Sequence, residues 1–227
     1  MLDKNKIAVI STGNGGQSMA AYFSYKGFNT ALYGREVERI AMFKSNVFEV
    51  SGEINEKVEI NMISNRIDEV IKDAHLIMVT TPSQYHHVVA RGMAPYLKDG
   101  QIVILNPGRS FGTTECWRIL KESGCKAKPV VAETETFFFT CRVNEPGKPM
   151  IYKIKDHINV AAHFDADMEL VVDTLSKVLD NIEGVSILDT AFSNMGMIFN
   201  HLPLLIDITR VESKENMLSY EGTISPI

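Results

Sequence analysis

Residues 13–18 near the N-terminus, with the sequence GNGGQS, have the spacing of a phosphate-binding turn. They fit the pattern Gly-x-Gly-x-x-(Gly or small residue) and directly follow the β-branched run of residues 6–11. Gly13 is expected to make the tight turn, Gly15 to let a pyrophosphate approach the backbone, and Ser18 to let the following helix pack on the strand. The N-terminus of that helix adds free N–H groups and a positive dipole end. The residues predicted to hold a dinucleotide at this turn are Gly13, Asn14, Gly15, Gly16 and Ser18.

The end of the next expected strand, residues 30–33, bears on which dinucleotide binds. An NAD site usually carries Asp or Glu about 20 residues past the first glycine, and that position is Tyr33. Gly34 and Arg35 follow, and they offer room and a guanidinium for the 2′-phosphate of NADP. We therefore predict NADP(H) in preference to NAD(H), with Arg35 as the phosphate ligand. Glu36 leaves a ribose contact of the NAD type open.

Three further polar stretches each follow an expected strand and should line one crevice. They are residues 80–86 (TTPSQYH), 106–109 (NPGR) and 133–136 (ETET). Ligands of open α/β sheets bind at the carboxyl ends of the strands, where these stretches fall. Arg109 supplies a cation suited to a carboxylate or a phosphate. The predicted substrate-binding residues are Arg109, Glu133 and Thr134, and the predicted contacts on the nicotinamide side are Thr81, Pro82 and Asn106.

Strand and helix patterns alternate along the chain, which indicates an α/β fold of the Rossmann type with a doubly wound parallel sheet. The expected strands are residues 6–11, 30–33, 75–79, 102–105, 129–132 and 150–162, and the expected helices are 15–25, one from 36, 83–97 and 165–184, with Asp165 as N-cap. From residue 186 the strand pattern stops and a helical stripe follows, formed by Leu188, Phe192, Met195, Phe199 and Leu202. We predict a dinucleotide-binding domain at 1–185 and the beginning of an all-α domain, incomplete here, at 186–227.

The composition fits a globular chain with a sizeable core. Of the 227 residues, 45% are hydrophobic and 22% are charged, and the formal net charge is −5. Because no long basic run is present, we expect no nucleic-acid partner. The chain lacks an apolar run of the roughly 18 residues that a membrane span needs, and it lacks a signal-peptide core. We therefore expect a cytoplasmic protein without a membrane partner. The three cysteines form no C-x-x-C pair, so we expect neither a disulfide framework nor a bound metal.

Taken together, these motifs resemble those of the opine dehydrogenase family, which includes octopine and nopaline dehydrogenases. The resemblance rests on the glycine turn, the Thr-Pro segment that ends at His86, residues 106–112, residues 132–134 and the helix from Asn194 to His201. In that family a nicotinamide cofactor reduces the imine formed between an amino group and a 2-oxo acid. The resemblance implies that His201 protonates and polarises the carbonyl or imine, a task that suits a side chain titrating near neutral pH. Asn194 lies two helical turns earlier on the same face, where it would orient substrate or cofactor.

This chain departs from the family pattern in its helical domain. Opine dehydrogenases continue well beyond the point that matches residues 220–223, and the acidic partner of their catalytic histidine lies in that continuation, so no residue is assigned to it here. The apolar stripe of residues 192–205 must be buried somewhere, and a homodimer is one way to bury it. The small-molecule partners expected are a 2-oxo acid and an amino acid.

Two other functions stay open at this stage. The first is a reductase of the ketopantoate reductase or glycerol-phosphate dehydrogenase kind. Such enzymes rely on a lysine in the cleft, and none accompanies Asn194 and His201 on their helix. The second is a dinucleotide-binding module without catalysis, which would bind cofactor fully and transfer no hydride.

Overall fold

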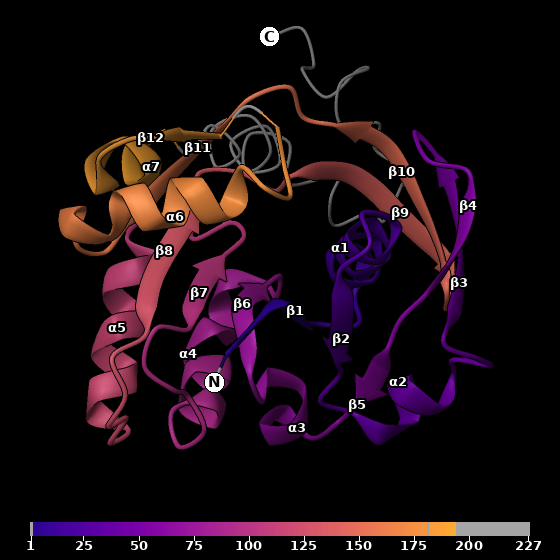
Figure 1. Cartoon of the computed structure of the whole chain (residues 1–227), viewed down its shortest axis with the longest axis horizontal. Coiled ribbons are helices and arrows are strands. Elements are labelled where there is room, and N and C mark those ends of the chain that lie inside the picture. Colours follow the sequence, from indigo (N-terminus) through magenta and orange to yellow (C-terminus); the bar gives the residue numbers. More distant parts are fainter. Residues whose placement is uncertain (1, 181, 194–227) are drawn as a thin grey trace, which may run out of the picture. The chain divides into compact units, whose positions relative to one another are not determined.

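The computed structural model describes residues 2–180 and 182–193. Contacts divide the chain after Ala191, and the residues up to that point form one compact α/β unit (Figure 1). The predicted boundary between residues 185 and 186 stays a prediction, as does the helical domain beyond it. Asn194, His201 and the later part of the helical stripe lie outside the described residues.

An eight-stranded sheet forms the centre of this unit, in the order β12-β11-β8-β7-β6-β1-β2-β5 (Figure 1). The strands are β1 (Asp3–Ile10), β2 (Asn29–Tyr33), β5 (Met62–Ser64), β6 (Ala74–Val79), β7 (Ile102–Leu105), β8 (Val130–Thr134), β11 (Ile158–Ala162) and β12 (Ile182–Gly184). From β8 to β5 all neighbouring strands are parallel, so the predicted Rossmann-type sheet is confirmed. One edge differs from the prediction, because β11 runs antiparallel to β8 with Val160 opposite Thr134.

Alternate side chains of the central strands fill the two faces of the sheet. In β1, Ile7 and Val9 belong to one core cluster, and Ala8 and Ile10 belong to the other. Burial on both faces explains why the sequence shows continuous apolar runs here rather than alternation. The face of Ala8 is covered by α3 (Ile67–Ile71), α4 (His86–Met93) and α5 (Gly112–Glu122), and the face of Ile7 by α1 (Asn14–Tyr25) and α6 (Met168–Leu175).

A second sheet of four strands packs against α1 on the side away from the main sheet (Figure 1). Its order is β4 (Glu56–Glu59), β3 (Val47–Gly52), β10 (Lys148–Ile154) and β9 (Phe139–Glu145). The helix therefore lies between two sheets, and its residues from Gly16 to Phe23 are all buried. A helix that is covered on both sides needs apolar residues all around it, rather than on a single stripe.

The second sheet was not predicted, and the prediction of a strand at 150–162 is wrong in its bounds. That stretch is two strands, β10 and β11, which belong to different sheets and are separated by residues 155–157. The helix predicted to continue to Gly184 ends at Leu175, and Gly184 lies in β12. Asp165 begins a short 3-10 turn (η2, Asp165–Asp167) and caps nothing with its side chain. The remaining short elements are α2 (Val37–Ala41), η1 (Ser83–Tyr85) and α7 (Ile187–Phe192).

Candidate functional site

The turn between β1 and α1 is built on a close approach of the helix to the strand. A Cβ atom at Gly16 would lie 1.8 Å from the carbonyl oxygen of Ser11, so only glycine fits there. Ser11 itself has φ of +150°, a backbone conformation that side-chain-bearing residues rarely adopt. Its hydroxyl accepts a hydrogen bond of 3.0 Å from the N–H of Gly13. The turn is therefore Ser11-x-Gly13-x-x-Gly16, with Ser11 in the place that the pattern gives to its first glycine.

This geometry corrects the predicted roles by shifting the pattern two residues toward the N-terminus. Because α1 begins at Asn14, Gly15 is already in the first helical turn, and Ser18 lies deeper in the helix with no exposed surface. The close packing of helix on strand, predicted for Ser18, falls on Gly16. Ser18 is thus a core residue and is withdrawn as a phosphate ligand.

The N-terminus of α1 offers backbone N–H groups. Gly13 is the N-cap and provides no side-chain cap, so the first N–H groups of the helix, at Asn14 and Gly15, have no partner within it. The Asn14 side chain points elsewhere, since its Oδ1 accepts a 3.0 Å hydrogen bond from the N–H of Val143 in β9. A Cβ at Gly15 would come within 2.8 Å of the tip of the Phe137 ring, so any larger residue there would have to displace that ring. A helix end of this kind can bind an anion through main-chain N–H groups alone.

Arg35 lies just past the end of β2 and next to the loop that follows β6. Its guanidinium carbon is 5.9 Å from the centre of the Tyr85 ring, and its Nη2 is 3.2 Å from Oε1 of Glu36. Arg39 also contacts Glu36, with Nε 3.6 Å from Oε2. All three charged side chains are more than half exposed. Glu36 thus forms ion pairs with both arginines.

Thr81 and His86 form one unit after β6. The Nε2 atom of His86 is 3.1 Å from the carbonyl oxygen of Thr81, and burial lowers the pKa of the imidazole. The hydroxyl of Thr81 is buried without a hydrogen-bond partner. Pro82 is exposed at the same edge. The buried, hydrogen-bonded His86 is a structural residue, while the Thr81 hydroxyl is a buried polar group without a partner in the protein.

Asn106 lies at the end of β7 with both polar atoms of its side-chain amide unpartnered. The residue has no exposed surface, and leaving a buried amide unpaired costs free energy. It is followed by three consecutive residues with positive φ, namely Arg109 (59°), Ser110 (38°) and Phe111 (67°). Such strain in non-glycine residues concentrates at functional sites. Orphaned amide atoms at this sheet edge fit a ligand that presents both donors and acceptors, as a nicotinamide carboxamide does.

Glu133 and Thr134 are buried inside the unit, which corrects their prediction as substrate contacts. Glu133 has no exposed surface, and its Oε2 accepts a 2.8 Å hydrogen bond from the N–H of Thr113. Its Oε1 accepts a 2.8 Å hydrogen bond from the hydroxyl of Thr190 in α7. Burial raises the pKa of this carboxyl, and the bonds to Thr113 and Thr190 oppose the rise. Thr134 is equally buried and donates to the carbonyl oxygen of Thr136 at 2.8 Å.

With this geometry in place, sequence comparison decides the family. The family profile for the NAD binding domain of 6-phosphogluconate dehydrogenase matches residues 6–127, more than half of the chain. The chain belongs to this family of NAD-binding domains. The match runs from β1 through α5 and includes the glycine turn and the loops that follow β2, β6 and β7.

The NAD-binding domain is also similar to opine dehydrogenases. Opine dehydrogenase of Arthrobacter sp. (strain 1C) is 29% identical over 230 residues, which cover 100% of this chain and 64% of the relative. The chain therefore spans less than two thirds of that relative's length. This match confirms the resemblance inferred from the motifs.

Solved structures share the fold. Octopine dehydrogenase with NADH and pyruvate superposes with a TM-score of 0.74 at 15% identity, over 94% of this chain and 57% of that one. Yersinopine dehydrogenase with NADP+ gives 0.72 at 15% identity, over 97% and 59%. A PanE/ApbA family ketopantoate reductase from Ralstonia eutropha JMP134 gives 0.60 at 15% identity, over 88% and 60%. At these identities the likeness shows the fold alone.

Several residues of the NAD-binding domain's site were not predicted from the sequence. Tyr85 lies in the stretch 80–86 but has no role of its own in the predicted site, Phe137 lies in no predicted motif, and Ser11 falls at the end of the expected first strand. The one signal for Ser11 was its place directly before Thr12-Gly13, where a third glycine would complete the pattern. Lys155, in the connection between β10 and β11, also faces this sheet edge, because its Nζ donates to Oγ1 of Thr136.

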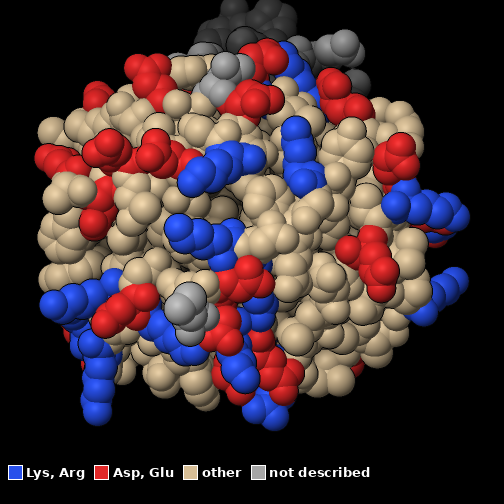
Figure 2. Space-filling model, in the orientation of Figure 1, with Lys and Arg blue, Asp and Glu red and all other residues tan. Residues whose placement is uncertain are grey.

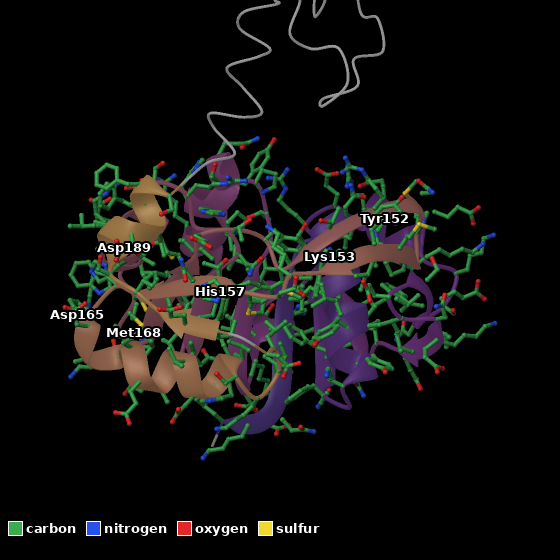
Figure 3. The ribbon with its side chains drawn as sticks, turned by 90° about the horizontal axis from the view of Figure 1, so that it is seen from above. Tyr152, Lys153, His157, Asp165, Met168 and Asp189 are labelled. Carbon is green, nitrogen blue, oxygen red and sulfur yellow. The ribbon has the colours of Figure 1, made fainter. Side chains whose placement is uncertain are left out.

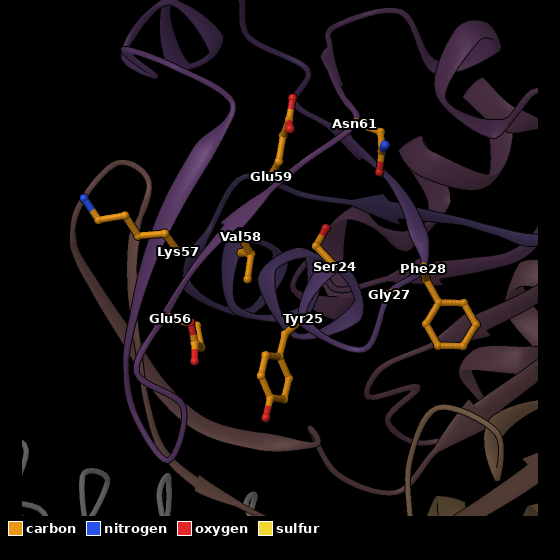
Figure 4. Close-up of a pocket in the computed structure, with 9 residues that line it drawn as sticks. All are labelled: Ser24, Tyr25, Gly27, Phe28, Glu56, Lys57, Val58, Glu59 and Asn61. Carbon is orange, nitrogen blue, oxygen red and sulfur yellow. The ribbon is translucent and has the colours of Figure 1, made fainter.

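A shallow hollow on the NAD-binding domain lies at the opposite end of α1 from the glycine turn (Figure 4). Ser24, Tyr25 and Gly27 border it on one side, and Glu56 and Lys57 of β4 border it on the other. It does not include any predicted site residue. Within residues 2–180 and 182–193, no group of three His, Cys, Asp or Glu side chains could hold a metal ion. No helix in that same part of the chain has the length and hydropathy of a membrane span.

Proposed function

We propose that this chain is part of an NADP(H)-dependent oxidoreductase of the opine dehydrogenase type. It would reduce the imine formed from an amino acid and a 2-oxo acid. Two observations carry the proposal: the N-terminus of α1 has no side-chain cap, and the Asn106 amide is unpartnered, each at the carboxyl end of a strand of the parallel sheet, where ligands of such sheets bind. The similarity to opine dehydrogenase over the whole chain supports the reaction class.

The residues that would hold the cofactor come from four strand ends, those of β1, β2, β6 and β7. The N–H groups of Asn14 and Gly15, with the space left by Gly13, suit a pyrophosphate. Thr81, Pro82 and Asn106 would border the nicotinamide. When bound, the cofactor supplies the hydride for reduction. Arg35, seated over Tyr85, would pair with a 2′-phosphate and so favour NADP(H).

The substrate side of the proposal depends on two residues outside the described part of the chain. His201 would donate a proton to the imine nitrogen as the imine carbon takes the hydride, and Asn194 would orient the substrate. Arg109 would bind a carboxylate. A homodimer and a cytoplasmic location stay predictions. On the face in Figure 2, aspartate and glutamate side chains gather at the upper left, and elsewhere lysine and arginine are interspersed with them, so this face carries no large basic patch for a polyanion.

A ketopantoate reductase-like activity is the second candidate. The fold likeness to such a reductase favours it. It differs in substrate, because a ketone is reduced directly and no amine is consumed. Turnover that requires an amine as well as a 2-oxo acid would decide for the opine type, and turnover with the oxo acid alone would decide for the reductase.

The test begins with parallel titrations of the purified chain with NADPH and NADH, read by nucleotide fluorescence. We expect tighter binding of NADPH and a loss of about tenfold in NADPH affinity on Arg35→Ala, with little change for NADH. Arg142→Ala is a matched control, since that arginine is exposed on β9. Equal binding of the two nucleotides would contradict the NADP assignment. His201→Asn should abolish turnover and keep NADPH affinity, and an unchanged rate would remove His201 from the mechanism.

A further inference from the structure

Lys155 stands apart from the other lysines near it. It lies in the three-residue connection between β10 and β11, and its side chain is half-buried. Its Nζ donates to the neutral hydroxyl oxygen Oγ1 of Thr136. Within the described part of the chain, no carboxylate forms an ion pair with it. Lys153, two residues earlier, pairs instead with Asp156 at 2.9 Å, and Lys148 pairs with Glu145 at 2.6 Å. A partly buried cation without a counter-ion is costly unless an anion joins it.

The backbone places this cation at the carboxyl edge of the main sheet. Lys155 N–H donates to the carbonyl oxygen of Phe138 at 3.0 Å, and Thr136 follows the end of β8 by two residues. Gly108, next to Arg109, donates its N–H to the carbonyl oxygen of Thr134 at 3.1 Å. The backbone next to Arg109 and the side chain of Lys155 therefore both contact the segment from Thr134 to Thr136 at the end of β8.

The charges around Lys155 agree with this placement. Burial lowers its pKa, the negative charge of Glu135 opposes the shift, and the positive charge of Arg109 adds to it. Glu135 accepts a 3.0 Å hydrogen bond from Nδ2 of Asn159, and within the described residues it forms no ion pair with Nζ of Lys155.

We propose that Lys155, together with Arg109, binds a substrate carboxylate and sets the preference of the site for anionic substrates. The inference rests on the proposed function. It adds a residue that no motif in the sequence marked, and it assigns Arg109 a partner. The chemistry recognised is a carboxylate, which either the 2-oxo acid or the amino acid can supply.

Calorimetry on the full chain at saturating NADPH tests the inference and separates the two sources. The probes are pyruvate against its uncharged amide, and L-arginine against agmatine, which lacks the carboxylate. We expect Lys155→Met to weaken binding of one acid, pyruvate or L-arginine, by at least about tenfold and to leave its uncharged counterpart unchanged. Lys155→Arg should retain most of the affinity because it keeps the charge.

Lys153→Met is the matched control, because that side chain is exposed on the end of β10, as Figure 3 shows, and already has Asp156 as its partner. It should leave all four affinities unchanged. Equal loss for acids and neutral probes in Lys155→Met, or no binding of either acid by the unaltered chain, would overturn the inference. NADPH affinity, measured separately on every variant, judges the proposed function, so the two ideas fail independently.

Discussion

Of the helices that begin at the carboxyl edge of the main sheet, α1 and α5 differ in what their N-termini contact. At α5, the carboxyl group of Glu133 accepts a hydrogen bond from the N–H of Thr113, so a buried side chain of the protein itself occupies the helix end. At α1, the N-cap is a glycine and no side chain caps the helix. The positive end of the α5 dipole therefore contacts a side chain of the protein. That of α1 has no such contact, so an external anion could bind there.

The glycines near the two helix starts differ in the same way. A Cβ at Gly108 would lie 2.3 Å from Cβ of Glu133, so this glycine makes room for the internal carboxylate. A Cβ at Gly16 would instead strike the backbone of Ser11, so that glycine brings the helix close to the strand and exposes its first turn. A glycine next to a helix start thus indicates an anion site only when no internal carboxylate already fills it.

Gly16→Ala should have the largest effect on stability, because it prevents the close approach of α1 to β1. The new methyl group would overlap the Ser11 carbonyl, so α1 must move off β1, and we expect a loss of about 3 kcal/mol or more in the free energy of unfolding. Urea denaturation measures it. Gly92→Ala in α4 is the control, because its Cβ would meet only Ile67 Cδ1 at 3.7 Å and helix propensity improves. Equal stability of the two variants would show that the close approach is not required.

Glu133→Ala should have a somewhat smaller effect on stability, because it removes the side chain that contacts the N-terminus of α5. It leaves the N–H of Thr113 and the hydroxyl of Thr190 without their partner, and we expect a loss of about 2 to 3 kcal/mol in the free energy of unfolding. Glu133→Gln keeps the shape and one acceptor and should lose less. If the alanine variant is as stable as the wild type, the carboxylate is not what holds the helix end.

The pH dependence of the stability of Glu133→Gln tests the role of this carboxyl group further. Burial raises the folded-state pKa of Glu133 above its usual 4.5, so the folded chain binds this proton more tightly than the unfolded chain. That contribution to stability is full below pH 4.5 and is lost as the pH rises through the folded pKa. The stability of Glu133→Gln relative to wild type should therefore increase with pH above 4.5. Urea titrations at several pH values measure it, and a constant difference would contradict it.

Substitutions at Asn14 test whether the open helix end acts through its backbone. Asn14→Ala removes the bond to Val143 and should cost about 1 kcal/mol of stability while leaving dinucleotide affinity nearly unchanged. Asn14→Asp keeps an acceptor for Val143 but puts a negative charge beside the phosphates, and should weaken dinucleotide binding by about tenfold. Fluorescence titration measures both. A large loss of affinity in the alanine variant would mean that the side chain itself binds the cofactor.

The sequence was sufficient for the main sheet because its strands are buried on both faces and show as apolar runs. The second sheet was missed since β3 and β4 alternate buried residues such as Phe48 and Val50 with charged ones and are short. The pairing of β3 with β10 joins residues about a hundred positions apart, which no local pattern reveals.

Within the site, residue types were easier to predict than roles. The glycine turn and Asn106 were identified, but a positive φ at Ser11 cannot be read from a serine, so the pattern was placed two residues late. Glu133 and Thr134 follow a strand as ligand contacts often do, and only burial shows that they face inward. Lys155 was missed because its neighbours in space come from distant parts of the chain.

The position of α1 between two sheets has a consequence for synthesis. The main-sheet face of α1 is covered by β1 and β2, which precede or closely follow it in the chain, but its other face is completed only by β9 and β10, which end at Ile154, after β3 and β4 have covered part of it. While the ribosome makes the hundred or so residues between, this face is only partly covered, and the ring of Tyr22 lacks its partner Phe139, 5.1 Å away in the folded chain. The nascent chain therefore exposes part of an apolar helix through much of its translation. Exposed apolar surface favours aggregation, so chaperone binding would be most useful during this period.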